Sequence, residues 1–150
     1  MKQKVLIGLT IITVLGCSQH GVDTKAEGEK VMQTSREWAK VSATGDVEKI
    51  LSYWADDAVV VMPGQPVLKG KKEIRQMVMG SFKIPGFKIT WQPQSVQVSQ
   101  SGDMAYMVEK GQVTMNDSSG KIIVQHNNGV TVWKKQSDGS WKNVADISTN

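Results

Sequence analysis

One stretch of this chain restricts the possible folds more than any other segment. Residues 53–74 read Y-W-A-D-D-A-V-V-V-M-P-G-Q-P-V-L-K-G-K-K-E-I. This order is typical of a helix end, a strand of β-branched residues, a turn at Pro63 and Gly64, a short strand and a helix with a basic start. Near the C-terminus, residues 137–147 combine a turn sequence with another strand. The alternation predicts an α+β domain, with helices first and a sheet afterwards.

Together the two segments resemble the SnoaL-like and ketosteroid-isomerase-like domains of the NTF2-like superfamily, including the DUF4440 group. The resemblance extends roughly from Glu27 to Ser148. It implies a cone, in which a curved mixed or antiparallel sheet wraps around about three N-terminal helices and leaves one buried pocket. Relatives commonly pair, so it also implies a homodimer. Because this fold carries many unrelated functions, the reaction has to be argued from side chains.

The N-terminus has the pattern of a signal peptide. Residues 1–4 are cationic, Val5–Leu15 are almost entirely apolar, and small residues around Gly16 follow. The apolar run is too short to cross a bilayer comfortably, and the small residues suit a processed cleavage site. Residues 1–16 are therefore predicted to be removed, with an uncleaved anchor helix as the alternative.

Cys17 ends a lipobox-like sequence, Val-Leu-Gly-Cys. Similarity to bacterial lipoproteins implies that Cys17 becomes the first mature residue and carries the lipid. Ser18, in place of Asp, is the pattern expected for transit to an outer membrane, where the domain would face the periplasm. In an organism with a single membrane this inference lapses. Residues 17–28 are predicted to form a polar tether, and residues 29–150 the folded domain.

Cysteine usage and charge exclude several classes of protein. Cys17 is the only cysteine, so an internal disulfide and a cysteine-based metal site are excluded. His20 and His126 are the only histidines, too few for a zinc site with several nitrogen ligands. Loss of two of the 18 basic residues with the signal peptide, against 14 acidic ones, lowers the net charge from +4 to +2. No basic stripe interleaved with aromatic residues is present, so nucleic acid is not expected as a partner. No cofactor or metal is expected either.

Three helices are predicted from the apolar spacing. The first places Val31, Ser35 and Trp38 on one face, and Gly45–Asp46 ends it and caps the second. The second helix follows a three-four spacing through Val47, Ile50, Leu51 and Trp54. The third is expected over Lys71–Phe82, without a strong side-chain cap at its start.

Five strands are predicted from alternating patterns and turn sequences. Pro93, inside the second of them, predicts a bulge or bend, because proline cannot donate to the ladder. The predicted strands are Ala58–Met62, Phe87–Val98, Met104–Met115, Lys121–Lys135 and Trp141–Ile147.

The catalytic groups of ketosteroid isomerase are absent from the matching positions. That enzyme uses an Asp base, with a Tyr and a protonated Asp as donors to the oxyanion. Counting back from Gly45–Asp46 places Trp38 at the Tyr position, and Met62 stands before the turn proline, where the base belongs. The second Asp would match Asn128 or Gly129. None of these side chains is a phenol or a carboxylic acid, so the sequence argues against steroid isomerisation by this constellation.

Three ionisable residues lie among apolar strand neighbours and are the candidate catalytic groups: His126, Glu109 and Asp146. The resembled group often carries an Asp near the end of the final strand, as Asp146 does. A histidine in a pocket with a carboxylate partner suits general acid–base work near neutral pH. The alternative is a histidine on a solvated edge, a glutamate paired with a lysine and a turn-capping aspartate.

Six residues are predicted to line the pocket, because of their type and their place on the predicted elements. They are Trp38, Trp54, Met62, Met107, Asn128 and Trp133. The methionines are more typical of core packing, but at the mouth of a cone they would suit an adaptable apolar ligand.

Three functions remain open from the sequence. The first is a lipid-anchored envelope protein whose domain binds a small, partly apolar molecule or serves as an accessory module, without established catalysis. The second is an enzyme of the polyketide-cyclase or isomerase type, in which His126 works with Glu109 or Asp146. The third is a non-catalytic dimerisation module. An open cavity with ionisable groups facing into it would favour the first two.

Overall fold

The structure is a computed structural model that describes residues 21–149, and it confirms the α+β class. The predicted signal peptide and Cys17 lie outside the described residues. None of the helices described is long and apolar enough to cross a membrane. The elements in chain order are α1 (Thr24–Ser42), α2 (Val47–Leu51), β1 (Trp54–Val61), β2 (Leu68–Lys69), α3 (Gly70–Ser81), β3 (Lys88–Val98), β4 (Met104–Asn116), β5 (Ile122–Lys135) and β6 (Trp141–Thr149).

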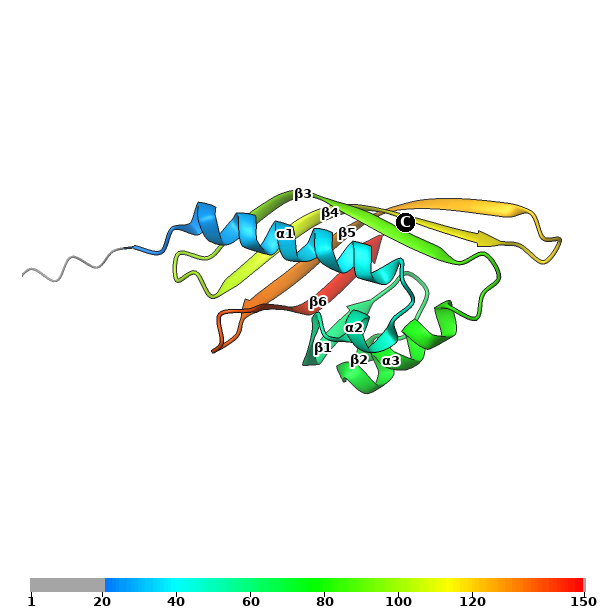
Figure 1. Ribbon diagram of the computed structural model, residues 1–150, viewed down its shortest axis with the longest axis horizontal. Coiled ribbons are helices and arrows are strands. Elements are labelled where there is room, and N and C mark those ends of the chain that lie inside the picture. Colours follow the sequence, from blue (N-terminus) through cyan, green and yellow to red (C-terminus); the bar gives the residue numbers. More distant parts are fainter. Residues whose placement is uncertain (1–20, 150) are drawn as a thin grey trace, which may run out of the picture.

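The six strands form one mixed sheet in the order β2-β1-β6-β5-β4-β3. β1 and β6 pair in parallel, and the other neighbours are antiparallel. α1 packs along β3, and α3 packs against β1, so the helices cover one face of the curved sheet (Figure 1). We call this the inner face and the opposite one the outer face.

The first helix begins earlier than the sequence predicts. α1 starts at Thr24, inside the segment expected to be a tether, because the Asp23 side chain accepts a hydrogen bond from the Ala26 amide and caps the helix. Glu27 is already buried within it. The predicted buried face is confirmed, and the folded domain therefore includes residues that were assigned to the tether.

The second helix is shorter than predicted. α2 ends at Leu51, and Trp54 begins β1 instead of closing the helix. The competing interaction is parallel pairing with β6, in which the Asn143 amide donates to the Tyr53 carbonyl and Trp54 lies opposite Asn143. Trp54 is nevertheless only 5% exposed. Strand pairing overrides the helical spacing, while the prediction of burial holds.

Two β-bulges change the faces to which side chains of the strands around the core point. The register between β3 and β4 shifts between Pro93 and Ser95, which confirms the predicted bulge at the proline. In the ladder between β5 and β6, Val132 pairs with Ala145 while Trp133 pairs with Asn143, so Val144 is an extra residue. This second bulge reverses the inward and outward alternation for the rest of β6.

Trp38 lies at the centre of the aromatic core. Its ring packs edge-on against Trp54, Trp91 and Trp133, with centroid separations of 4.5, 5.0 and 5.8 Å, and it stacks on Tyr53 at 5.8 Å. Such pairs add to the stability gained from area burial. The cluster joins α1 to β1, β3 and β5. Trp38, Trp54 and Trp91 also belong to the wall of the cavity described below.

Candidate ligand-binding cavity

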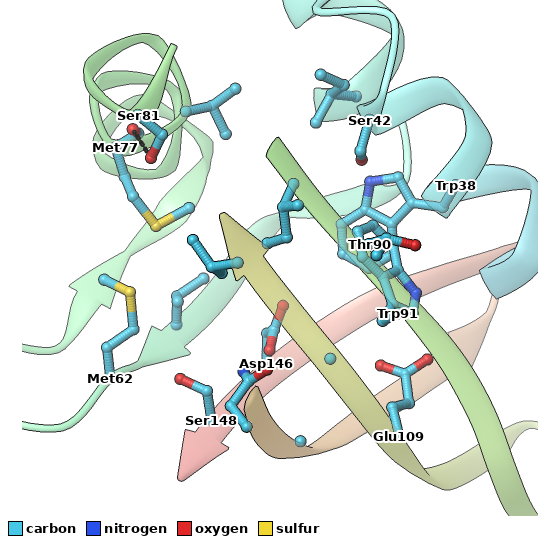
Figure 2. A pocket seen from close by; sticks show the side chains of 18 of the residues that line it. Trp38, Ser42, Met62, Met77, Ser81, Thr90, Trp91, Glu109, Asp146 and Ser148 are labelled. Atoms are coloured by element: carbon cyan, nitrogen blue, oxygen red, sulfur yellow. Dashed lines mark hydrogen bonds between the residues drawn. The ribbon is translucent and has the colours of Figure 1, made fainter. Parts of the chain in front are cut away.

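A cavity of about 260 Å³ lies between α1, α3 and the inner face of the sheet. Figure 2 shows the thioethers of Met62 and Met77 on one side and the indoles of Trp38 and Trp91 on the other. The carboxyl groups of Glu109 and Asp146 extend from the sheet into this region. The 21 residues that form its wall are mostly apolar, and they include serine and threonine hydroxyls. The volume is near the lower end of the range for small-molecule sites.

Three of the six predicted lining residues lie in the wall of the cavity: Trp38, Trp54 and Met62. Trp38 is supplied by α1 because the helix repeat aligns it with Val31 and Ser35. Met62 follows directly after β1, where the chain leaves the sheet. Met62, which was matched from the sequence to the base of ketosteroid isomerase, therefore contacts the cavity through an apolar thioether, which does not take up a proton.

Met107, Trp133 and Asn128 are placed differently from the prediction. Met107 and Trp133 are fully buried on the inner face, where they pack in the hydrophobic core instead of forming the wall. Asn128 pairs with Lys110 on the outer face and is exposed. Its neighbour Asn127 faces the cavity instead, so the prediction was off by one residue, which moves a side chain to the other face.

His126 does not belong to the cavity. It lies opposite Gln112, one residue out of phase with the inward-facing Gly111 and Asn127, and it is exposed on the outer face. Its apolar strand neighbours Val124 and Val130 lie on the same face, which is the one that faces away from the helices. The structure therefore separates His126 from the two carboxyl groups with which it was predicted to act.

Glu109 is the most unusual ionisable group of the inner face. Its side chain shares the face of Ala105 and Met107 and is only 6% exposed. Burial away from water raises the pKa of Glu109 from 4.5 to about 7; the Ser35 hydrogen bond opposes the rise, and the charge of Asp146 adds to it. Near neutral pH this carboxyl group is present in both the protonated and the ionised form.

Two hydroxyl groups connect Glu109 to tryptophan side chains. The Trp91 indole donates to Ser35 Oγ at 2.9 Å, and Ser35 donates to Glu109 Oε1 at 2.5 Å. On the sheet, the Trp133 indole donates to Thr131 Oγ1 at 2.9 Å, and a further hydrogen bond from Thr131 favours the ionised form of Glu109. Both arrangements fix the orientation of the carboxyl group, since each hydroxyl is itself held by an indole.

Asp146 reaches the cavity because of the bulge at Val144. Strict alternation from Asn143, which is buried, would turn Asp146 outward, but the extra residue brings it opposite Val60 on the inner face. Protein atoms surround its carboxyl group, and burial raises the pKa of Asp146 to about 6. The residue as a whole is half-buried, and it belongs to the wall of the cavity. No described residue donates a hydrogen bond that lowers this pKa.

Two indole N–H groups of the wall have no hydrogen-bond partner among the described residues. They belong to Trp38 and Trp54, both of which are buried. Figure 2 shows the Trp38 nitrogen on the edge of the ring next to Ser42, another residue of the wall. Unpaired buried donors are uncommon in folded proteins.

The described residues contain no group of three or more His, Cys, Asp or Glu side chains that would hold a metal ion. The sequence did not identify Ser35, Thr131 or Trp91 as residues of the site. Ser35 and Glu109 are 74 residues apart in the chain, and no local pattern signals their contact.

Comparisons with known proteins identify the family. The sequence profile of the SnoaL-like domain family matches residues 31–146, which is most of the chain. The protein therefore belongs to the SnoaL-like domain family, a group with the NTF2-like fold. No curated protein sequence matches it.

Solved structures support the same fold. A ketosteroid isomerase-like protein from Erwinia carotovora atroseptica SCRI1043 superposes with a TM-score of 0.72 at 20% identity, covering 81% of this chain and 94% of that chain. A conserved protein from Planctomyces limnophilus DSM 3776 gives 0.69 at 16% identity, with 83% and 98% covered. An NTF2-like protein of unknown function from Pseudomonas putida KT2440 gives 0.68 at 17%, with 84% and 87% covered. At these identities the likeness defines the fold alone.

Proposed function

We propose that this protein binds one small, mostly apolar molecule in the cavity and orients it through a polar group at Glu109 and Asp146. The observation that carries the proposal is the placement of two carboxyl groups together at one wall of an otherwise largely apolar cavity. Apolar surface supplies affinity in such sites, and a few polar groups fix orientation.

A substitution at Gly129 is expected to fill the cavity without straining the fold. It lies in the wall opposite Glu109 in the β4–β5 ladder, and a Cβ atom built there comes no closer than 3.7 Å to any neighbour. Gly129→Leu is therefore expected to fill the cavity. Gly80→Leu is the matched control, because Gly80 is an exposed position of α3 with open space around it.

Native mass spectrometry of the full chain, purified from its own cells, tests the proposal. We expect the parent and Gly80→Leu to retain the same small molecule, and Gly129→Leu to lose it while its unfolding free energy is maintained. Isothermal titration with 2-phenylethanol, a small neutral probe, should show the same pattern, with binding weakened at least about tenfold in Gly129→Leu. Equal retention by both variants would show that the molecule binds outside this cavity.

A second candidate function is proton transfer on a bound substrate. It is favoured by the pKa of Glu109, about 7, because a general acid or base works best when its pKa is close to the working pH. Ser35 and Thr131 hold the carboxyl group in a fixed direction, and Asp146 supplies a second acid–base group of the same cavity. His126, which was predicted to take part, lies on the outer face and has no role in this proposal.

Hydrogen exchange on a small ketone tests this second function. With 4-phenyl-2-butanone in D₂O, we expect exchange at the carbons next to the carbonyl above the buffer rate, increasing as the pH rises through 7. Glu109→Gln should abolish the excess, whereas Asp57→Asn, at an exposed position of β1, should retain it. Exchange no faster than in buffer would leave binding as the function.

We also propose that the domain is anchored to the cell envelope through lipid on Cys17, on the outer membrane and facing the periplasm. The support is the sequence before the domain, with its cationic start, apolar run and Val-Leu-Gly-Cys. Cys17→Ala should remove metabolic fatty-acid labelling and leave an unprocessed or soluble precursor. Undiminished labelling of this variant would overturn the assignment.

A homodimer through the outer face is proposed from the apolar side chains exposed there. Tyr106 is 51% and Ile122 is 65% exposed, and Val124, Val130 and Ile147 continue the same face. Exposed apolar side chains gathered on one face of a sheet are typical of interaction sites. Sedimentation equilibrium should give a dimer for the parent and a monomer for Val130→Lys. A parent that stays monomeric at high micromolar concentration would exclude it.

A further inference from the structure

We propose that the cavity selects small organic cations, namely amines with an apolar body, over neutral or anionic molecules of the same size. This inference rests on the proposed binding function and adds the charge of the ligand. Three observations support it: the charges of the residues that line the cavity, the different surroundings of the buried carboxylate of Glu27, and the aromatic residues of the wall.

The described wall of the cavity contains acidic groups without any basic group. Among its 21 residues only Glu109 and Asp146 ionise, and no lysine, arginine or histidine is present. Ionising two neighbouring carboxyl groups away from water is unfavourable unless a positive charge lies close by. An ammonium group between them would supply the missing charge and would donate hydrogen bonds to both.

Glu27 shows how this protein stabilises a carboxylate that belongs to the fold alone. Its oxygens accept hydrogen bonds from Lys30 at 2.7 Å, from Lys135 at 2.8 Å and from the Trp141 indole at 3.1 Å. Glu109 receives only neutral hydroxyl donors. At Glu27 the cations are lysines of the protein itself. Glu109 has no such partner, so a cationic ligand could take that role.

Asp146 is the more accessible of the two acceptors in the cavity. Ser35 occupies Glu109 Oε1, whereas no hydrogen bond from a described residue acts on the ionisation of Asp146, which stays partly accessible. A primary ammonium carries three donors, and charge-assisted hydrogen bonds are the stronger kind. We therefore expect Asp146 to be the principal partner of the ligand nitrogen, with Glu109 as the second.

The remaining wall suits the rest of such a molecule. Trp38, Trp54 and Trp91 surround the cavity with indole rings, which attract cations through their negative faces. Met62 and Met77 provide adaptable apolar contacts on the opposite side (Figure 2). The volume of about 260 Å³ suits an amine with roughly one ring. Carboxylate or phosphate ligands would be repelled by the two acidic groups.

Three probes of nearly the same shape separate charge from size: 2-phenylethylammonium, 2-phenylethanol and phenylacetate. Each is titrated into the full chain by calorimetry at pH 7. We expect the amine to bind at least about tenfold more tightly than the alcohol, and phenylacetate not to bind. Asp146→Asn keeps the shape of the side chain and should remove most of the preference for the amine, while affinity for the alcohol changes less than about twofold.

Two controls make the result specific to the cavity. Asp57→Asn removes the same charge from an exposed position and should leave all three affinities unchanged. Gly129→Leu should weaken the amine and the alcohol together. Equal affinity for the amine and the alcohol, tighter binding of phenylacetate, or a preference that survives Asp146→Asn would overturn the inference and leave the binding function intact. If neither the amine nor the alcohol binds, both the proposed binding function and the inference about charge are wrong.

Discussion

Glu27 and Glu109 are buried glutamates on the same side of one sheet, but their surroundings differ. Glu27 accepts hydrogen bonds from two lysines and an indole, and these partners lower the pKa of Glu27 to about 2, with Lys135 as the largest cause. Glu109 lies in an apolar wall with neutral donors, and burial raises its pKa to about 7. One residue type thus has pKa values on opposite sides of its ordinary value.

The comparison indicates which buried charge belongs to the fold and which belongs to a site. A carboxylate with its own cations stabilises the native state, and nothing is left for a ligand to add. A carboxyl group held in a cavity without a counter-charge is unfavourable for the fold, and such groups are concentrated at functional sites. Glu27 pairs with two lysines whose side chains are partly exposed, whereas Glu109 lies among the buried residues of the inner face.

The largest expected effect on stability comes from removing a buried tryptophan from the wall of the cavity. Trp54→Ala removes a buried indole that packs edge-on against Trp38 at 4.5 Å, and we expect a loss of about 3–5 kcal/mol in unfolding free energy. Water admitted beside Glu109 should also lower its pKa toward 4.5. Chemical denaturation measures the first effect. A loss of only a few tenths of a kcal/mol would show that Trp54 contributes little to this core.

The next effect is the pH dependence of stability. The folded state binds the Glu109 proton more tightly than the unfolded state, so the contribution of this group to stability is greatest below pH 4.5 and decreases as the pH rises to about 7. Since one pKa unit corresponds to about 1.4 kcal/mol, Glu109 alone should lower the unfolding free energy by about 3 kcal/mol across this interval. Asp146 acts in the same direction between pH 3.8 and about 6.

Glu109→Gln should remove most of that slope, because a neutral amide has no proton to lose. The matched control is Glu29→Gln, an exposed position of α1, whose pH profile should follow that of the parent. A parent whose stability increases from pH 5 to pH 7.5 would contradict the assigned environment of Glu109.

A smaller effect of opposite sign is expected at Glu27. Its folded pKa is lowered, so its contribution is present above pH 4.5 and is lost as the pH falls toward 2. Glu27→Gln should cost about 1–2 kcal/mol at pH 7, less than a fully buried ion pair, because the lysine ends remain in contact with water. The difference from the parent should disappear in strong acid. A constant difference at every pH would show that packing, not charge, is responsible.

The smallest expected effect concerns the hydrogen bonds that hold Glu109. Ser35→Ala removes its strongest donor and leaves the Trp91 indole without an acceptor, which we expect to cost about 1 kcal/mol. The pKa of Glu109 should rise further, so the loss should be larger at pH 8 than at pH 5. Thr34→Ala, at the neighbouring position of α1, should show no such pH dependence. An equal loss at both pH values would mean that Ser35 does not act on Glu109.

The sequence predicted the strands, and it made Glu109 a candidate because apolar residues alternate around it. The structure places Glu109 on the inner face beside the buried Ala105 and Met107. The same reasoning failed for His126. Its apolar row is regular, but periodicity groups residues by face without saying which face the helices cover. An exposed apolar face and a buried one give the same pattern in a single sequence.

Other features of the site depend on contacts that no local pattern encodes. Asp146 was proposed from its place near the end of the last strand, but its inward direction results from the extra residue Val144 in the ladder with β5. The connection from Trp91 through Ser35 to Glu109 joins α1, β3 and β4. These interactions follow from how the helices pack on the sheet, and they determine the pKa on which the proposed chemistry depends.

The most direct test of the account is a ¹³C NMR titration that follows the side-chain carboxyl signals of Glu27 and Glu109 in one sample. We predict that Glu109 titrates near pH 7 and that Glu27 stays ionised down to about pH 2. Assignments come from Glu27→Gln and Glu109→Gln. If Glu109 titrates at or below 4.5, it has water or a cation beside it, and the claim that the cavity lacks a counter-charge is wrong.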